Sequence, residues 1–350
     1  MYDTIRPIIW HEGTLQLLDQ RLLPQQVIYN SYTSAEAVAT AISEMVVRGA
    51  PAIGITAAYG VVLATQQALQ GHVADWRQAV AKAIALLAKA RPTAVNLAWA
   101  LAEMEPLVSK VKEHHALEKL LARAVAIHQQ DIADNHTMGE LGTALIAQGG
   151  GANPVGVLTH CNAGALATGG YGTALGVIRS AFAAGKIHQV YADETRPWLQ
   201  GARLTAWELL QDKIPVTLIA EGAAARLMHQ QRVTWVVVGA DRIAANGDVA
   251  NKVGTSGVAI IARHYGVKVM VVAPTSTIDM HTTNGSGIPI EERPASELLD
   301  FHGETVAAAG CGAWNPVFDV TPASLIDAIV TEKGVVEQPS YAKLAALMRR

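Results

Sequence analysis

The second half of the sequence alternates short apolar runs with segments of helical pattern, and this alternation limits the fold more than any other feature. The apolar runs lie at residues 155–159, 189–192, 216–220, 235–239 and 267–272. Helical patterns at residues 204–210, 223–229 and 257–264 lie between them. Strands that lack a period of two and are separated by helices are typical of a parallel sheet covered on both faces. This half therefore predicts a Rossmann-like domain.

The first half is dominated by helical signals instead. Ser34 is suited to cap a helix, because apolar residues follow it at helical spacing. Further helical patterns, rich in Ala, Leu and Lys, lie at residues 79–90 and 117–128. Ahead of Ser34, residues 14–18 and 26–29 predict a small antiparallel pair of strands.

The two patterns meet at a clear break in the sequence. Residues 147–154 hold three consecutive glycines followed by Asn153 and Pro154, a composition typical of a connecting loop. A chain of 350 residues is long enough for two domains. We therefore expect a mainly helical N-terminal domain over residues 1–150 and a Rossmann-like domain over residues 151–350, an α/β protein as a whole.

Composition argues against several classes of protein. No apolar stretch reaches the ~18 consecutive residues that a membrane span needs, and no secretory signal is visible at the N-terminus. Two cysteines without framework spacing suggest a reducing compartment, so we expect a cytoplasmic protein. The formal net charge is −3 with scattered basic residues, which argues against a nucleic-acid partner. No His, Cys or acidic spacing requires a metal.

Polar residues follow the apolar runs of the second half. Cys161, Asp193 with Glu194, Glu221 and Asp241 each stand just past the last apolar residue of a predicted strand. Any one of them could be an ordinary capping or solvated residue. In a doubly wound sheet, however, all of these positions open onto the crevice at the carboxyl ends of the strands. The series predicts a catalytic edge, with Cys161 as its most informative member.

A dinucleotide site is an alternative for this edge. The segment from Gly170 to Gly176 approximates a glycine fingerprint, and Asp193 ends the next strand at a suitable distance. Two features argue against it. Residues 159–168 make the turn before the glycines too long, and the glycine spacing is one residue off.

The segment Arg48-Gly49-Ala50-Pro51 is a candidate anion cradle. Pro51 suits the first turn of a helix, and Gly49 allows a close approach of the backbone. Free N–H groups at a helix start beside the Arg48 guanidinium would hold a phosphate or a carboxylate. The plain alternative is a helix start with a surface arginine.

Several motifs together resemble one family. They are Arg48-Gly49-Ala50-Pro51-Ala52-Ile53-Gly54, Thr159-His160-Cys161-Asn162-Ala163-Gly164, Thr195-Arg196-Pro197, Gln200-Gly201-Ala202-Arg203-Leu204-Thr205-Ala206-Trp207-Glu208-Leu209, Gly239-Ala240-Asp241-Arg242-Ile243, residues 246–254 and Phe318-Asp319-Val320-Thr321-Pro322. In this order they resemble the methylthioribose-1-phosphate isomerase family, to which ribose-1,5-bisphosphate isomerases and regulatory subunits of translation initiation factor 2B also belong. The resemblance extends over residues 5–340.

The resemblance implies roles for individual residues. Cys161 and Asp241 would be the catalytic pair. The substrate, a small phosphorylated sugar, would contact Arg48, Gly49, Ala50, Arg91, Gln200, Asn251 and Lys252. The family further implies a homodimer that uses no cofactor. One departure is Ser256, where an aromatic residue often follows Gly-Thr in the family.

The implied reaction converts 5-methylthioribose 1-phosphate to its ketose in methionine salvage. Because phosphate occupies the anomeric oxygen, ring opening needs a proton donor, and Asp241 would have to be protonated near neutral pH. Cys161 could then act as a general acid/base, or hydrogen could move as a hydride. Ribose-1,5-bisphosphate isomerisation and a non-catalytic regulatory role are the alternatives that the sequence leaves open.

Overall fold

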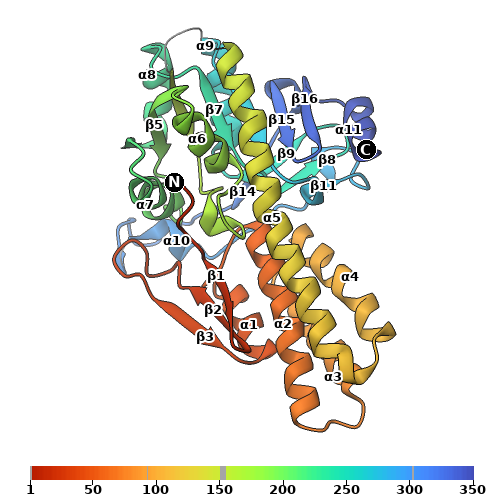
Figure 1. Cartoon of the computed structure of the whole chain (residues 1–350). Helices are drawn as coiled ribbons and strands as arrows, with labels where there is room; N and C mark the ends of the chain where they lie inside the picture. The colour runs from red at the N-terminus through yellow and green to blue at the C-terminus, as the bar shows by residue number, and fades with distance from the viewer. Residues whose placement is uncertain (1, 93, 150–154, 302) are drawn as a thin grey trace.

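The computed structural model describes residues 2–92, 94–149, 155–301 and 303–350. Two lobes lie one above the other in Figure 1, and the long helix α5 (Glu113–Gly149) runs through both. The predicted domain boundary at residues 150/151 lies outside the described residues. The α/β fold class, with a helical N-terminal part and a parallel C-terminal sheet, is confirmed.

The N-terminal lobe combines a helical bundle with a three-stranded antiparallel sheet. Its elements are β1 (Ile8–His11), β2 (Thr14–Leu18), β3 (Tyr29–Tyr32), α1 (Ala35–Ser43), α2 (Ala50–Gln70), α3 (Trp76–Ala90), α4 (Val95–Lys110) and the first half of α5. Strand β2 was predicted residue for residue, but its partner β3 begins only at Tyr29 and β1 was missed. Val27 and Ile28 are exposed and precede the strand, so the prediction from their apolar side chains began the strand too early.

Helix α2 is the centre of this lobe. Ser34 caps the preceding helix as predicted, its Oγ accepting the Ala37 N–H at 3.1 Å. Pro51 lies in the first turn of α2. By length and composition α2 could cross a membrane, but 83% of its 18-residue apolar window is buried inside the protein. Its apolar surface is therefore explained by packing against α1, α3, α4 and α5.

The C-terminal lobe is built on a seven-stranded sheet of order β16-β15-β10-β7-β4-β5-β6. The strands are β4 (Val155–Thr159), β5 (Ile187–Asp193), β6 (Val216–Ile219), β7 (Trp235–Val238), β10 (Lys268–Val272), β15 (Ala328–Thr331) and β16 (Gly334–Glu337). All neighbours are parallel except β16, which runs antiparallel to β15. The five predicted strands are confirmed, with bounds that differ by at most two residues.

Helices cover both faces of this sheet. The core on one face includes residues from α6 (Ala174–Ala183), α7 (Ala206–Gln211) and the second half of α5. The core on the other face includes α8 (Ala224–His229), α9 (Thr255–Tyr265) and α11 (Tyr341–Met348). Helix α5 therefore contributes to the cores of both lobes, which ties the position of the bundle to that of the sheet.

The polar segment between β7 and α9 is an ordered hairpin. Its strands β8 (Arg242–Ala244) and β9 (Val249–Lys252) belong to a second sheet of order β11-β8-β9-β14, with β11 at Ile278–Asp279 and β14 at Phe318–Thr321. At its turn, Asp248 accepts hydrogen bonds from the Asn246 side chain and from the Gly285 and Ala323 N–H groups.

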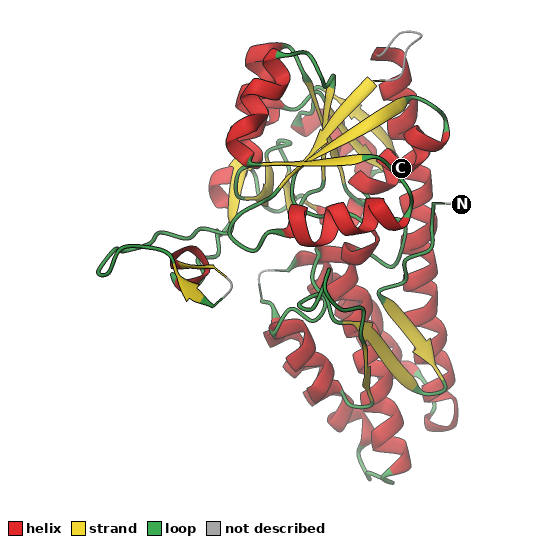
Figure 2. Ribbon diagram, turned by 90° about the vertical axis from the view of Figure 1, so that its left-hand side faces the viewer, coloured by secondary structure: helices red, strands yellow, loops and turns green. Residues whose placement is uncertain are grey.

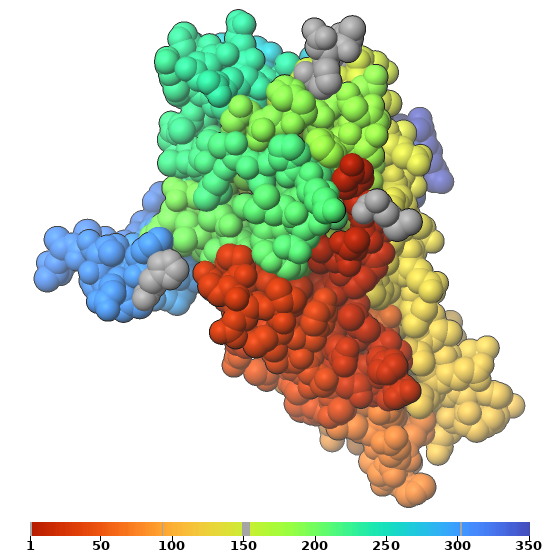
Figure 3. Space-filling model, turned by 60° about the vertical axis from the view of Figure 1, so that its left-hand side comes forward, coloured from red at the N-terminus to blue at the C-terminus, as the bar shows by residue number. Residues whose placement is uncertain are grey.

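Between β11 and β14 the chain leaves the C-terminal lobe as a projecting arm, residues 289–317 (Figures 2 and 3). The arm carries the short elements α10 (Ser296–Leu299), β12 (Asp300–Phe301) and β13 (Glu304–Thr305). Its base returns to the cleft between the lobes, where Glu291 pairs with Arg91 of the N-terminal lobe.

Gly49 is a point of close contact between the lobes, and its replacement by alanine should be costly. Its φ is +96°, and a Cβ there would lie 2.5 Å from the Ala167 Cβ. We expect Gly49→Ala to lower the free energy of unfolding by about 1–3 kcal/mol through backbone strain, with steric overlap adding to the loss.

Urea denaturation measures this effect, and Gly257→Ala is the matched control. Gly257 is exposed in α9, and a Cβ there would meet no atom within 4 Å. This control should be neutral or gain up to about 1 kcal/mol. Equal stability of the two variants would contradict the close packing at Gly49.

Candidate functional site

The strand order places Cys161 and Asp241 at the topological switch point of the sheet. Counted along the chain, the six parallel strands lie in the order 3-2-1-4-5-6, with β4 first and β7 fourth. Successive connections lead away from β4 on one side and from β7 on the other, which opens a crevice at their carboxyl ends. Cys161 lies two residues beyond β4, and Asp241 lies three residues beyond β7.

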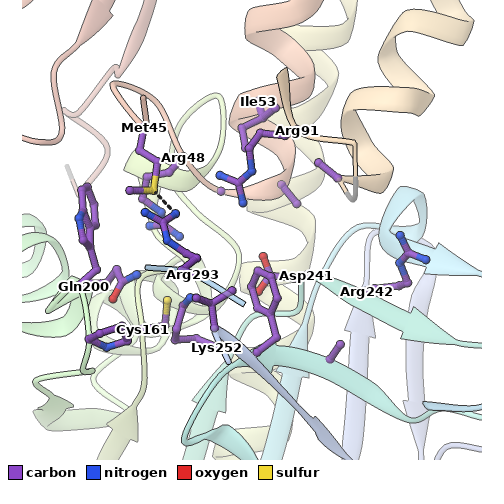
Figure 4. Close-up of a pocket in the computed structure, with 18 of the residues that line it drawn as sticks. Met45, Arg48, Ile53, Arg91, Cys161, Gln200, Asp241, Arg242, Lys252 and Arg293 are labelled. Atoms are coloured by element: carbon purple, nitrogen blue, oxygen red, sulfur yellow. Dashed lines mark hydrogen bonds between the residues drawn. The ribbon is translucent and has the colours of Figure 1, made fainter. Parts of the chain in front are cut away.

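A pocket of about 90 Å³ lies in this crevice, and the N-terminal lobe forms its roof (Figure 4). Arg48 and Arg91 reach into it from the N-terminal lobe, while Cys161, Asp241 and Lys252 face them from the sheet. Its lining residues are Met45, Arg48, Gly49, Ala50, Ile53, Arg91, Ala94, Cys161, Pro197, Trp198, Gln200, Asp241, Arg242, Ala250, Lys252, Ile288, Pro289, Arg293, Glu297, Val317 and Phe318.

Eight of the nine residues predicted for the site line this pocket. The ninth, Asn251, lines a smaller adjoining cavity of about 30 Å³ at the N-terminus of α2, together with Gly49, Ala50, Cys161 and Asp241. The Asn251 amide donates to the Thr255 hydroxyl at 3.0 Å. The structure therefore gathers all nine around one crevice, while their chemical roles stay predictions. Ser256 is absent from the lining, so this departure from the family pattern leaves the described wall unchanged.

The backbone of Cys161 is held in an unusual conformation. Its φ is +64°, in the left-handed region that non-glycine residues rarely adopt. The Cys161 N–H donates to the Thr195 hydroxyl at 2.9 Å, and its carbonyl accepts from the Thr205 hydroxyl at 2.6 Å. These two bonds fix the direction in which the thiol leaves the turn. A strained residue held in this way is a frequent feature of functional sites.

Burial shifts the ionisable groups of the pocket toward their neutral forms. It raises the pKa of Asp241, although Lys252, Arg48 and Arg91 oppose the shift. It also raises the pKa of the Cys161 thiol, against the opposing charges of Arg48 and Lys252. The Lys252 pKa is lowered by burial, which its acidic neighbours Cys161 and Asp241 partly offset. Asp241 thus keeps its proton to higher pH than an exposed aspartate.

Arg48 is anchored by the turn that carries Cys161. Its guanidinium donates to the Asn162 carbonyl at 3.0 Å and to the Asn162 Oδ1 at 2.8 Å. The Asn162 amide donates in turn to the buried Glu208 at 2.9 Å. The arginine is therefore aimed at the pocket before any ligand arrives.

The pocket has a basic character. Five of the residues that line it are basic, Arg48, Arg91, Arg242, Lys252 and Arg293, whereas two are acidic, Asp241 and Glu297. Arg242 points away from the centre of the pocket toward Asp279, at 3.5 Å (Figure 4). The buried Oε1 of Gln200 has no hydrogen-bond partner among the described residues. Such a set of groups suits a small, strongly anionic ligand that also accepts or donates hydrogen bonds.

Sequence reasoning missed residues that the arm, the start of β14 and the β5–α7 connection bring to the pocket. Arg293 of the arm pairs with Glu297 at 2.5 Å and contacts the Met45 sulfur at 3.0 Å. Phe318 lies under the Lys252 ammonium, 4.6 Å from it to the ring centroid. Trp198 closes another part of the wall. The mixed-charge run around Arg293 is typical of a solvated loop, so no signal in the sequence distinguished Arg293 from an ordinary surface residue.

The glycines after Cys161 serve chain packing, which removes the basis of the dinucleotide alternative. A Cβ on Gly172 would lie 2.4 Å from the Gly164 Cα, and one on Gly169 would lie 2.5 Å from His128. Neither lines the pocket. Asp193 is buried and bonds to His160, and Glu221 accepts the Arg196 N–H at 2.8 Å. Of the polar residues that follow the strands, only Cys161 and Asp241 are among the lining residues.

Known proteins resemble this chain in sequence and in fold. The Initiation factor 2 subunit family matches residues 46–338. A methylthioribose-1-phosphate isomerase of Thioalkalivibrio sulfidiphilus is 62% identical over 99% of this chain and 98% of its own length. Two solved structures are similar over 99% of this chain. One is 5-methylthioribose 1-phosphate isomerase from Pyrococcus horikoshii OT3, with 40% identity, a TM-score of 0.91 and 96% of that chain covered. The other is translation initiation factor eIF-2B, subunit delta, from A. fulgidus, with 38% identity, a TM-score of 0.88 and 100% covered.

The burial of Cys161 predicts slow alkylation with a shifted pH dependence. The thiolate is the reactive form, so a raised pKa means that the rate at pH 8 is low and rises as the pH approaches that pKa. Each unit of pKa rise lowers the thiolate fraction about tenfold. Iodoacetamide labelling followed by peptide mass spectrometry measures the rate at each cysteine.

Cys311 is the internal comparison, because it is exposed on the arm. It should be labelled first, and Cys311→Ser should remove the fast phase alone. Rapid labelling of Cys161 at neutral pH would contradict the direction of its shift.

Proposed function

Because the chain belongs to the Initiation factor 2 subunit family, we propose that it is the aldose–ketose isomerase of that family, which converts 5-methylthioribose 1-phosphate to 5-methylthioribulose 1-phosphate in methionine salvage. The observation that supports this most directly is that Cys161 and Asp241 line one pocket at the switch point, together with Arg48 and Arg91 of the N-terminal lobe. The substrate class, a small sugar phosphate, suits the basic pocket.

The cations of the pocket bind the phosphate in this proposal. Arg48 is already oriented by Asn162, and free N–H groups at the start of α2 lie beside it. Arg91 and Lys252 complete the anion site. Binding a phosphate there fixes C1 and C2 of the sugar against Cys161 and Asp241, which supplies the positioning part of catalysis.

Asp241 is the proton donor for ring opening. The anomeric oxygen of the substrate carries phosphate, so the ring cannot open as a free hemiacetal does. A proton from the Asp241 carboxyl to the ring oxygen allows the bond between that oxygen and C1 to break. The raised pKa of Asp241 keeps this acid protonated at higher pH than usual, as a general acid requires.

Hydrogen then moves from C2 to C1, while O2 gives its proton to the Asp241 carboxylate, which restores the acid, and becomes the ketone oxygen. In one route the Cys161 thiolate removes the C2 proton and returns it to C1. In the other, C2 hydrogen passes directly to C1 as hydride, and Cys161 and Asp241 polarise the oxygens. The raised pKa of Cys161 makes the thiol form dominant in the free protein, so the first route begins from a minority thiolate.

Two alternative functions come from the same family. Ribose 1,5-bisphosphate would bring a second phosphate, whereas the pocket also offers apolar surface from Met45, Trp198, Ile288 and Phe318, which suits a methylthio group better. A non-catalytic regulatory subunit is the other alternative, and the similarity to the A. fulgidus initiation-factor protein favours it. Retention of both Cys161 and Asp241 favours an enzyme.

We also infer that the protein acts in the cytoplasm as a homodimer and needs no cofactor. The scarcity of cysteine supports the compartment. The dimer rests on the family resemblance.

The function is tested by direct turnover. Purified protein is incubated with 5-methylthioribose 1-phosphate and, separately, with ribose 1,5-bisphosphate, and the ketose carbonyl is followed by ¹³C NMR. We expect conversion of the first sugar with a clearly higher kcat/KM. Preference for the bisphosphate would move the assignment within the family. No conversion of either, with specific capture of a protein partner, would support the regulatory role.

Cys161→Ser and Asp241→Asn should each abolish most turnover while leaving substrate binding measurable. Loss of one general acid or base typically costs about 10²–10⁴-fold in rate, because proton transfer in the transition state is lost. Steady-state kinetics and calorimetric binding of the sugar phosphate separate the two effects. Cys311→Ser is the matched control, since this exposed thiol lies outside the pocket. Near-normal activity of either pocket variant would refute the assigned pair.

A further inference from the structure

His160, the residue before Cys161, is buried and outside the proposed catalytic pair. Its side chain and that of Asp193 are both 0% exposed. The imidazole Nδ1 lies 3.1 Å from Asp193 Oδ2, and Nε2 lies 2.9 Å from the Val253 carbonyl oxygen. It therefore joins three chain segments, the ends of β4 and β5 and the turn between β9 and α9.

The partners of the ring fix its protonation. A carbonyl oxygen only accepts, so Nε2 carries a hydrogen and donates it to Val253. Nδ1 then faces a carboxylate oxygen, which requires one further proton between His160 and Asp193. With that proton the buried pair is neutral overall. Its loss would leave a net negative charge in the interior, near the Glu221 and Asp319 carboxylates.

The ring is also the surface on which the β9–α9 turn rests. Gly254 has a φ of +105°, and a Cβ on it would lie 2.7 Å from His160 Cε1 and 2.8 Å from Glu221 Oε1. Asp319 of β14 holds the same turn from the other side by accepting the Gly254 N–H at 2.8 Å. Lys252 immediately precedes this turn, so its position follows that of Val253 and Gly254.

Cys161 follows a strand of one sheet, whereas Lys252 ends a strand of another. Strand β4 lies in the seven-stranded sheet and β9 in the four-stranded sheet, and the two strands are not neighbours in either. No ladder of backbone hydrogen bonds therefore sets the distance between the thiol and the ammonium. The His160–Val253 bond provides such a link, because His160 is adjacent to Cys161 and Val253 is adjacent to Lys252.

We propose that His160 is a positioning residue that sets the Lys252 ammonium against the Cys161 thiol by bonding the Val253 carbonyl, with Asp193 fixing the orientation of its ring. For catalysis this inference rests on the proposed isomerase function. Its geometric content concerns the free protein and stands apart from any substrate.

Two substitutions distinguish the contribution of Nε2 from that of Nδ1. In His160→Gln the side-chain amide can occupy the place of Nε2 and still donate to Val253. In His160→Asn the amide takes the place of Nδ1, contacts Asp193 and leaves the Val253 carbonyl unpaired. Asp193→Asn should preserve the ring orientation, because its amide can donate to a bare Nδ1 while Nε2 keeps its hydrogen and its bond to Val253.

The measurements are kcat/KM and the pH dependence of Cys161 alkylation, both in a Cys311→Ser background. We expect His160→Asn to lower kcat/KM about 10²-fold, the cost of a misplaced group of this kind, and to shift the alkylation profile to higher pH as Lys252 retreats. His160→Gln and Asp193→Asn should keep the profile and stay within about tenfold of the parent in kcat/KM, because each retains the hydrogen bond to Val253.

Thr159→Val is the matched structural control. It removes a buried hydrogen bond at the end of the same strand, from the Thr159 hydroxyl to the Val237 carbonyl at 2.8 Å, without touching Val253. It should lower the melting temperature and leave the alkylation profile in place.

An unchanged alkylation profile in His160→Asn would overturn the proposal. So would a loss of activity in all four variants that merely parallels their melting temperatures. If His160→Asn does not fold, a shifted profile in Asp193→Asn or His160→Gln would overturn it equally. If the parent protein turns over neither sugar phosphate, the isomerase assignment fails, while the alkylation comparison still decides the role of His160.

Discussion

The turn that carries Cys161 keeps its shape because a buried carboxylate lies beneath it. Glu208 accepts the N–H groups of Ala165 and Leu166 and the amide of Asn162, and it pairs with Arg179 at 2.9 Å. A buried carboxylate is stable only when its lone pairs are satisfied in this way. Since Asn162 in turn holds Arg48, one fully bonded charge on α7 orients a cation that comes from the other lobe.

The charges of the pocket are balanced in the same way. Burial favours the neutral forms of Cys161, Asp241 and Lys252. The two arginines of the N-terminal lobe have fixed partners: Arg48 donates hydrogen bonds to Asn162, and Arg91 pairs with Glu291. An incoming phosphate meets donors that are already aimed, so little ordering remains to be done when it binds. Asp241, the acid that must keep its proton in the proposed reaction, lies in a buried environment that favours its protonated form.

The two lobes share helix α5, which limits how the site can move. Helix α5 packs in the N-terminal bundle through its first half and against the sheet through its second half. Gly49 is packed against Ala167 across the same boundary. The arm adds a third connection, with Glu291 bonded to Arg91 and Arg293 in contact with Met45. The pocket wall is thus assembled from segments more than 200 residues apart in sequence, as Arg293 and Met45 are.

The sequence by itself determined those features that local chemistry decides. Ser34 caps a helix, Pro51 begins one, and the strand ending at Thr159 could be predicted residue for residue, because caps, turns and apolar periodicity depend on neighbouring residues. The family resemblance added the residues that the pocket gathers. Only the tertiary structure decided that Arg293 belongs to the pocket and that His160 bonds Val253. These contacts depend on strand order and on the path of the arm, which bring together side chains that no local pattern relates.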